Sequence, residues 1–144
     1  MQALSKEQLA YFQLTFQQLG LDYPNLADLD LPMPVLAFQQ GMLSFAAHGA
    51  YVDGVAAMFA AEWMYLNWCR KAIAKPISDP VLRQWVALHT ADAFASQATW
   101  LKREVDAAGR ALDELGRQRA SRVFRSALQF EIGFHSAPYE ALGI

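Results

Sequence analysis

The sequence contains little of several features that mark particular classes of protein. Its single cysteine excludes an internal disulfide framework and fits a reducing compartment such as the cytoplasm. Charged residues make up only 18% of the chain and the formal net charge is −2, so we expect no surface for nucleic acid. The first seven residues lack the cationic and apolar regions of a signal peptide, which favours a cytoplasmic location.

A long uninterrupted apolar run is also missing. The most apolar stretch, Met42–Cys69, contains His48, Asp53 and Glu62. A membrane-spanning helix needs about 20 consecutive, mostly apolar residues, and ionisable groups inside it are costly. We therefore interpret this stretch as buried helix and expect no membrane association. With 54% hydrophobic residues in a chain of 144, residues 1–144 are expected to form one domain with a substantial core.

What the sequence does contain is helical periodicity along almost its whole length. Alternation of apolar and polar residues, which is typical of half-buried strands, is not found. Gly20 and Pro138 are expected to end helices, Ser5 and Ser78 to cap them, and Thr90 to mark a bend. The predicted helices cover about 5–20, 34–48, 51–74, 79–109 and 112–136, with a long connection over 21–34. The predicted fold is an all-α bundle of five or six helices.

Two glutamates stand where such helices should be apolar. At about 100° per residue, the face centred on Glu62 is otherwise formed by neutral side chains. Glu131 lies in the same way on the face of Val123 and Ala127, whereas Arg125 falls on the far side. A buried carboxylate costs several kcal/mol unless it is paired, hydrogen-bonded or protonated. Two such positions on two helices indicate one polar pocket inside a helical core.

A pocket of this kind could perform acid–base chemistry. Two carboxylates that share a poorly hydrated site do not both ionise readily, so one of them can donate a proton near neutral pH. We therefore predict that Glu62 and Glu131 are catalytic and lie within about 8 Å of each other, a separation at which charges still interact in a medium of low dielectric constant. The structural alternative is a pair of glutamates hydrogen-bonded to aromatic or backbone groups.

Three segments, read in order, resemble the TenA family, the thiaminase II group within the haem-oxygenase-like all-α fold. Residues 60–65, ending in Tyr65, resemble the family's Pro-Cys-x-x-x-Tyr segment. Trp85 and His89, followed by Phe94, resemble its Trp-Ile-x-x-Tyr and following phenylalanine. Residues 124–134 resemble its Phe-x(6)-Glu-x-x-Phe signature, with Glu131 on the glutamate.

The resemblance implies a function and further site residues. The family's nucleophilic cysteine falls on Ala61 here, and the neighbouring Glu62 resembles a subgroup that places a glutamate in this region. The implied function is hydrolysis of an aminomethylpyrimidine in thiamin salvage, by carboxylate catalysis and without a cofactor or metal. The expected substrate-binding residues are Tyr65, His89, Phe124 and Trp85.

The family usually begins with further helices that contribute to the pyrimidine pocket, so we expect an N-terminally shortened member. A bundle that lacks helices would expose an apolar face, and the expected partner is therefore a second copy of the chain, in a dimer or tetramer. Two alternatives remain open from the sequence. One is a non-catalytic ligand-binding or interaction module on the same fold. The other is a metal-dependent haem-oxygenase-like oxidase that uses Glu62, Glu131 and His135.

Overall fold

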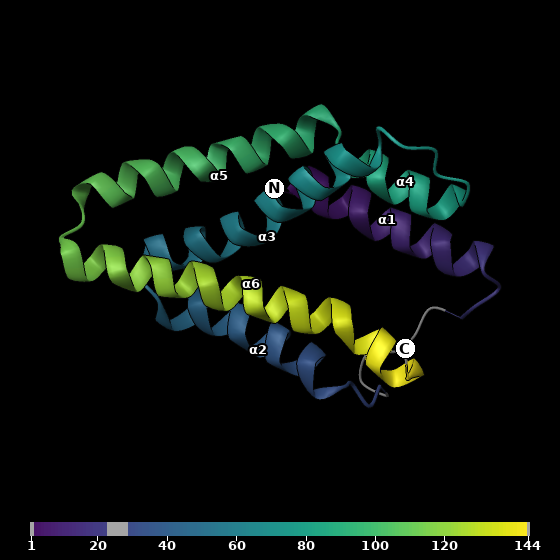
Figure 1. Cartoon of the computed structure of the whole chain (residues 1–144), viewed down its shortest axis with the longest axis horizontal. Helices are drawn as coiled ribbons and strands as arrows, with labels where there is room; N and C mark the ends of the chain where they lie inside the picture. Colours follow the sequence, from purple (N-terminus) through teal and green to yellow (C-terminus); the bar gives the residue numbers. More distant parts are fainter. Residues whose placement is uncertain (1, 23–28, 144) are drawn as a thin grey trace. The chain divides into compact units, whose positions relative to one another are not determined.

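The computed structural model describes residues 2–22 and 29–143. Six helices and no strands occur in this part of the chain, which confirms the predicted all-α class (Figure 1). In chain order the helices are α1 (Gln2–Gln18), α2 (Met33–His48), α3 (Tyr51–Ala72), α4 (Pro80–Leu88), α5 (Asp92–Ala111) and α6 (Glu114–Leu142). Residues 23–28 of the predicted connection lie outside the described residues.

Local sequence explains most of the helix ends. Gly20 adopts a left-handed φ of 66°, and the Leu21 amide donates to the Phe16 carbonyl, which is the arrangement of a Schellman stop. The predicted stop at Gly20 is therefore confirmed. Near Thr90, the long fourth segment divides into α4 and α5, and the Thr90 hydroxyl donates to the Val86 carbonyl at 3.1 Å, a type of hydrogen bond that often bends helices.

Three predicted helix ends are wrong. Helix α1 already begins at Gln2, so Ser5 lies inside it. Asp79 rather than Ser78 caps α4, since its Oδ1 atom accepts the Leu82 amide at 2.8 Å. Pro138 does not end α6, which continues to Leu142 and stops at Gly143 with a φ of 70°. Proline removes its own amide hydrogen bond and crowds the carbonyl one turn earlier, and α6 continues for only four residues beyond it.

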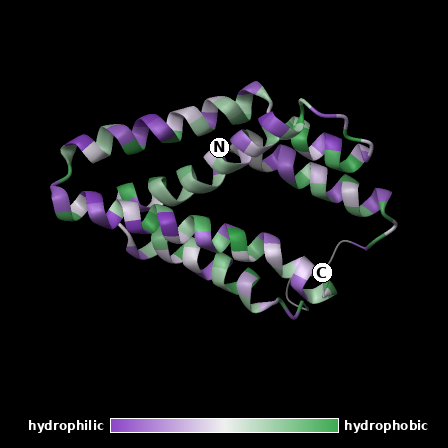
Figure 2. Cartoon of the chain, in the orientation of Figure 1, coloured by the Kyte–Doolittle hydropathy of each residue, from purple (hydrophilic) through white to green (hydrophobic). Residues whose placement is uncertain are grey.

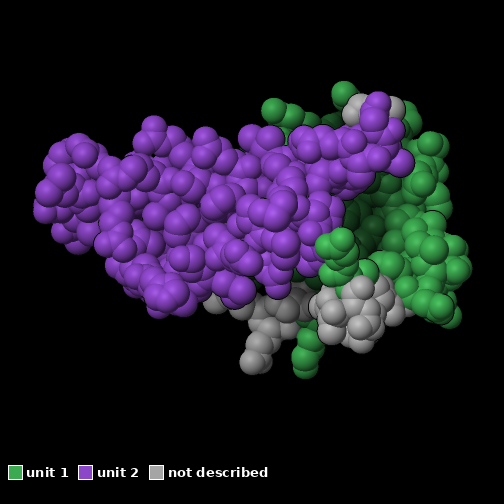
Figure 3. Space-filling view, turned by 90° about the horizontal axis from the view of Figure 1, so that it is seen from below, with its two compact units in different colours: residues 1–30, 65–97 green, residues 31–64, 98–144 purple. Residues whose placement is uncertain are grey.

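The chain divides into two compact units, which are coloured separately in Figure 3. Unit 1 comprises residues 1–30 and 65–97, and unit 2 comprises residues 31–64 and 98–144. Helices α3 and α5 each contribute residues to both units. The expectation of a single domain over 1–144 stays a prediction. Within the described part of the chain, none of the helices combines the length and apolar character that crossing a bilayer requires.

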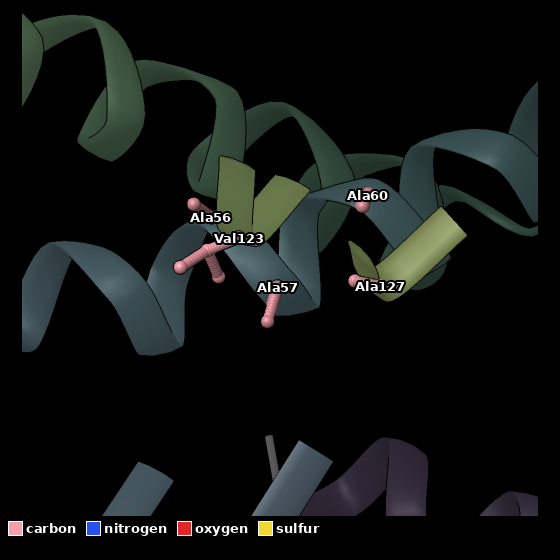
Figure 4. Close-up of a cluster of buried hydrophobic side chains, with 5 residues drawn as sticks. All are labelled: Ala56, Ala57, Ala60, Val123 and Ala127. Atoms are coloured by element: carbon pink, nitrogen blue, oxygen red, sulfur yellow. The ribbon is translucent and has the colours of Figure 1, made fainter. Parts of the chain in front are cut away.

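Unit 2 is organised around a core of small side chains from α3 and α6. Its buried residues, drawn in Figure 4, are Ala56, Ala57, Ala60, Val123 and Ala127. Small residues let two helix backbones approach closely. The space between the helices is then filled by direct van der Waals contact of their backbones rather than by large side chains. Larger, partly buried side chains from α2 and α5, such as Phe45 and Val105, surround this core.

Helix α2 packs along α6 in the same unit, as Figure 1 shows. The close approach occurs at Gly41, where an added Cβ atom would lie 2.7 Å from Cζ of Phe130. The rings of Phe38 and Phe134 extend this contact, with centroids 5.1 Å apart. No residue of α2 is fully buried, although the helix carries no Asp, Glu, Lys or Arg. Its outer face therefore leaves Met33 and Leu43 exposed.

Candidate functional site

Glu131 occupies the buried position that its place in the sequence predicts. It lies on α6 and is only 1% exposed, next to the buried Val123 and Ala127 on the same face. Its Oε2 atom is 3.7 Å from Nε2 of His135, one turn further along the helix. Burial lowers the pKa of His135, so the imidazole is mainly neutral at pH 7 and supplies little charge compensation to the carboxylate.

Glu62 lies on α3 in the same unit and is half-buried. Its Oε2 atom is inaccessible to solvent, so part of the carboxylate has left water. The residues that flank it on the predicted face, Val55 and Leu66, are buried. The predicted burial of a carboxylate on an apolar helix face is therefore found for Glu131, whereas Glu62 is only half-buried.

The register between α3 and α6 bears on whether the two carboxylates meet. Arg119 contacts Asp53 at 2.6 Å, and the ring centroids of Phe59 and Phe124 are 5.6 Å apart. The helices therefore run parallel, with paired residues separated by 119 − 53 = 66 and 124 − 59 = 65 positions. At about 1.5 Å per residue, this register offsets Glu62 and Glu131 by roughly 5 Å along the helix axes. A shared pocket is compatible with this register, and the separation of about 8 Å stays a prediction.

Three of the four predicted substrate-binding residues form an aromatic cluster in unit 1. The ring of Tyr65 lies 5.7 Å from that of Trp85 and 5.3 Å from that of His89, between centroids. Trp85 and His89 are 4.3 Å apart. Phe94 closes the cluster at 4.9 Å from His89. The matched segments of α3 and α4 thus contribute to one group of tilted and edge-on rings.

His89 has a defined tautomer in this cluster. Its Nδ1 atom lies 2.7 Å from the Trp85 carbonyl oxygen, which can only accept a hydrogen bond. Nδ1 therefore carries the proton, and Nε2 remains a hydrogen-bond acceptor. The ring is 6% exposed, and this burial lowers the pKa of His89 despite the opposing effect of the Trp85 hydrogen bond. At neutral pH, His89 is thus a neutral residue able to accept a hydrogen bond from a ligand.

Phe124, the fourth predicted substrate-binding residue, belongs to unit 2. It is half-buried, contacts Phe59, and lines a cavity of about 500 Å³ that neither Glu62 nor Glu131 lines. Along α6 it precedes Glu131 by seven residues, which is roughly 10 Å at the usual helical rise. The described contacts bring Phe124 together with apolar residues rather than with the carboxylates.

Cys69 has the properties of a packing residue. It is 1% exposed, and burial raises the pKa of its thiol to about 11. The nucleophilic form is the thiolate, which is scarce at pH 7 under these conditions. Among the described residues, no group of three or more His, Cys, Asp and Glu side chains is placed to hold a metal ion.

Sequence reasoning missed Asp53, a carboxylate that is as fully buried as Glu131. Asp53 is 1% exposed in the first turn of α3, where its Oδ2 atom accepts the Ala50 amide at 2.8 Å and contacts Arg119 at 2.6 Å. The signal in the sequence was the position of Asp53 between the apolar residues Val52 and Val55, which are both buried. The partner is 66 positions away in the sequence, so the ion pair itself could not be predicted.

Comparison with known proteins agrees with the matched segments. The model of the TENA/THI-4/PQQC family matches residues 1–141. A curated relative, the aminopyrimidine aminohydrolase of Halalkalibacterium halodurans, is 24% identical over 125 residues. The match covers 85% of this chain and 56% of that protein, so the chain spans little more than half the length of the relative. A family match of this extent identifies the chain, which belongs to the TENA/THI-4/PQQC family.

Proposed function

We propose that this protein is an aminopyrimidine aminohydrolase that releases ammonia from an aminomethylpyrimidine in thiamin salvage. The observation that carries the proposal is the burial of Glu131, at 1% exposure, on the helix that matches the family's Phe-x(6)-Glu-x-x-Phe signature. The family membership and the activity named for the relative supply the reaction class. The cytoplasm is the expected location.

The proposed chemistry divides two roles between Glu62 and Glu131. One carboxylate is ionised and removes a proton from water as its oxygen attacks the carbon of the aminomethyl group. The other is protonated and gives its proton to the departing nitrogen. A C–O bond forms, the C–N bond breaks, and the products are a hydroxymethylpyrimidine and ammonia. No electrons are exchanged with an external donor or acceptor, so the reaction requires no redox cofactor.

Substrate contacts are proposed for Tyr65, Trp85, His89 and Phe124. These assignments follow the matched segments residue by residue. Flat aromatic rings favour stacking of a heteroaromatic ligand, and the acceptor nitrogen of His89 suits an amino substituent. A Tyr65→Phe variant tests the hydroxyl alone, and the expected result is a raised KM with a smaller change in kcat.

We also propose that the protein is a homo-oligomer, either a dimer or a tetramer. The exposed apolar side chains of α2, including Met33 at 74% and Leu43 at 61%, support this proposal. Helix α2 carries no Asp, Glu, Lys or Arg whose hydration would favour exposure of this face to solvent. Light scattering at micromolar concentration should give a multiple of 16.1 kDa. A monomeric mass with cooperative unfolding would contradict the proposal.

The experiment that tests the catalytic proposal is ammonia release from an aminomethylpyrimidine. Glu131→Gln and Glu62→Gln should each lower kcat by at least about 100-fold, because the amide keeps the shape but transfers no proton. Glu140→Gln is the matched control, since Glu140 is exposed on the same helix as Glu131. Cys69→Ala should keep most of the activity, because its thiol is buried and protonated.

The outcomes separate the alternatives. Loss of activity only in Cys69→Ala would refute the carboxylate mechanism. Wild-type protein that binds the pyrimidine without releasing ammonia would favour a ligand-binding module instead. Far-UV circular dichroism of each variant should match wild type, so that lost activity can be assigned to chemistry rather than unfolding.

A further inference from the structure

The cavity of about 500 Å³ in unit 2 is lined by Phe124 but by neither of the proposed catalytic glutamates. Its walls come from α3, α5 and α6, and the residues Val52, Ala56, Val105 and Leu112 make most of its lining apolar. This volume lies within the range of small-molecule binding sites, which are typically about 300–1,000 Å³. Such sites combine an apolar interior with a few polar groups that fix the orientation of the ligand.

Polar groups of the required kind lie along one edge of the cavity. Arg117, Ser121 and Arg125 are spaced four residues apart on α6, so they form a single row on one face of the helix. The same three residues also line a second, more polar cavity of about 350 Å³, to which Arg122 contributes. The two cavities therefore adjoin each other along this row.

One of the two arginines in this row carries an unpaired positive charge. Arg117 contacts Glu114 at 3.3 Å, so its charge is partly neutralised. Among the described residues, none forms a salt bridge with Arg122 or Arg125. The start of α6 is accordingly rich in hydrophilic residues, as Figure 2 shows. An apolar cavity edged by the unpaired guanidinium group of Arg125 and the partly neutralised one of Arg117 has the charge pattern that complements an amphipathic anion.

We propose that this cavity binds an amphipathic anion, with its apolar body in the cavity and one carboxylate or phosphate at Arg117 and Arg125. The planar guanidinium group presents paired donors that match both anions, and the Ser121 hydroxyl can add a further hydrogen bond. The site is separate from the carboxylate pair, because neither Glu62 nor Glu131 lines it.

The chain offers a matched pair of glycines for testing this site. Gly109 lines the cavity from α5, and a Cβ atom added there would meet no atom within 4 Å. A leucine at this position therefore has room for its side chain beside the cavity, and we expect it to occupy part of the cavity. Gly54 in α3 also has no atom within 4 Å of an added Cβ atom, but it does not line the cavity. Both are helical positions where replacing glycine favours the helix.

The experiment titrates the protein with octanoate, octyl phosphate and octanol by isothermal titration calorimetry. Wild type should bind one equivalent of at least one of the two anions and bind octanol at least tenfold more weakly. Gly109→Leu should abolish binding, whereas Gly54→Leu should leave it unchanged. Arg125→Gln should weaken the binding of the anion tenfold without changing the affinity for octanol. Because Arg125 is exposed, the substitution should not disturb the fold.

The two anions identify the head group, since the tighter binder shows whether the site favours a carboxylate or a phosphate. Equal affinity for octanol and the anions would overturn the proposal, and so would unchanged binding in Gly109→Leu. Absence of binding by both anions would overturn it as well. Thermal melting of each variant confirms folding. Ammonia release is not used as the readout, so failure here leaves the proposed catalytic function unaffected.

Discussion

The ion pair between Asp53 and Arg119 gives the most quantitative prediction for the fold. Asp53→Ala removes a hydrogen bond from the Ala50 amide to a charged acceptor, which contributes about 1.5–3 kcal/mol. It also removes the contact with Arg119, whose side chain is 55% exposed, so water screening limits this part to about 1 kcal/mol. Removal of the buried Oδ1 atom, which has no hydrogen-bond partner among the described residues, offsets part of the loss. We expect a net destabilisation of about 2 kcal/mol.

The assay is urea unfolding followed by far-UV circular dichroism, with linear extrapolation to water. Asp53→Ala, Arg119→Ala and the double variant form a thermodynamic cycle that isolates the pair. We expect a coupling energy of about 1 kcal/mol, at the upper end for an exposed ion pair because one partner is 1% exposed. A coupling energy below about 0.3 kcal/mol would refute the assignment of this pair as a link between α3 and α6.

Three other predictions concern single side chains. Burial lowers the pKa values of His89 and His135 in the folded protein. As pH falls, these histidines are therefore protonated in the unfolded state before they are protonated in the folded state. Stability should therefore decline below about pH 6.5, and His89→Gln should reduce that decline in urea unfolding. Asp113→Ala should cost about 1 kcal/mol, because Oδ1 of Asp113 accepts the Gly116 amide at 2.8 Å; an unchanged midpoint would contradict this cap. Cys69 should react with a thiol reagent only slowly at pH 7 in the native state, and labelling as fast as in urea would contradict its burial.

Much of the fold could be predicted because helical periodicity and chain breaks are local properties. Gly20 stops α1 through its own backbone conformation, and Thr90 marks the division between α4 and α5. One error occurred where two neighbouring residues could serve the same purpose. Ser78 and Asp79 are both good caps, and only the backbone path decides that Asp79 receives the Leu82 amide. A different error concerns Pro138, which was predicted to end the last helix although α6 continues past it to Leu142.

The candidate site was predictable to a different extent for each residue. The burial of Glu131 followed from its position on an apolar face, since periodicity determines which residues face a core. The contact between Glu131 and His135 followed from their spacing of four residues. The ion pair of Asp53 and the cavity edged by Arg125 depend on which helices pack together. Such contacts connect distant parts of the sequence and leave no local pattern.

The most direct test of the central claim is a crystal structure of the protein soaked with an aminomethylpyrimidine. The account predicts that the aminomethyl nitrogen lies within hydrogen-bond distance of a carboxylate of Glu62 or Glu131, and that the two carboxylates are within about 8 Å of each other. A pyrimidine bound elsewhere, or carboxylates on opposite sides of the helices, would contradict the proposed mechanism.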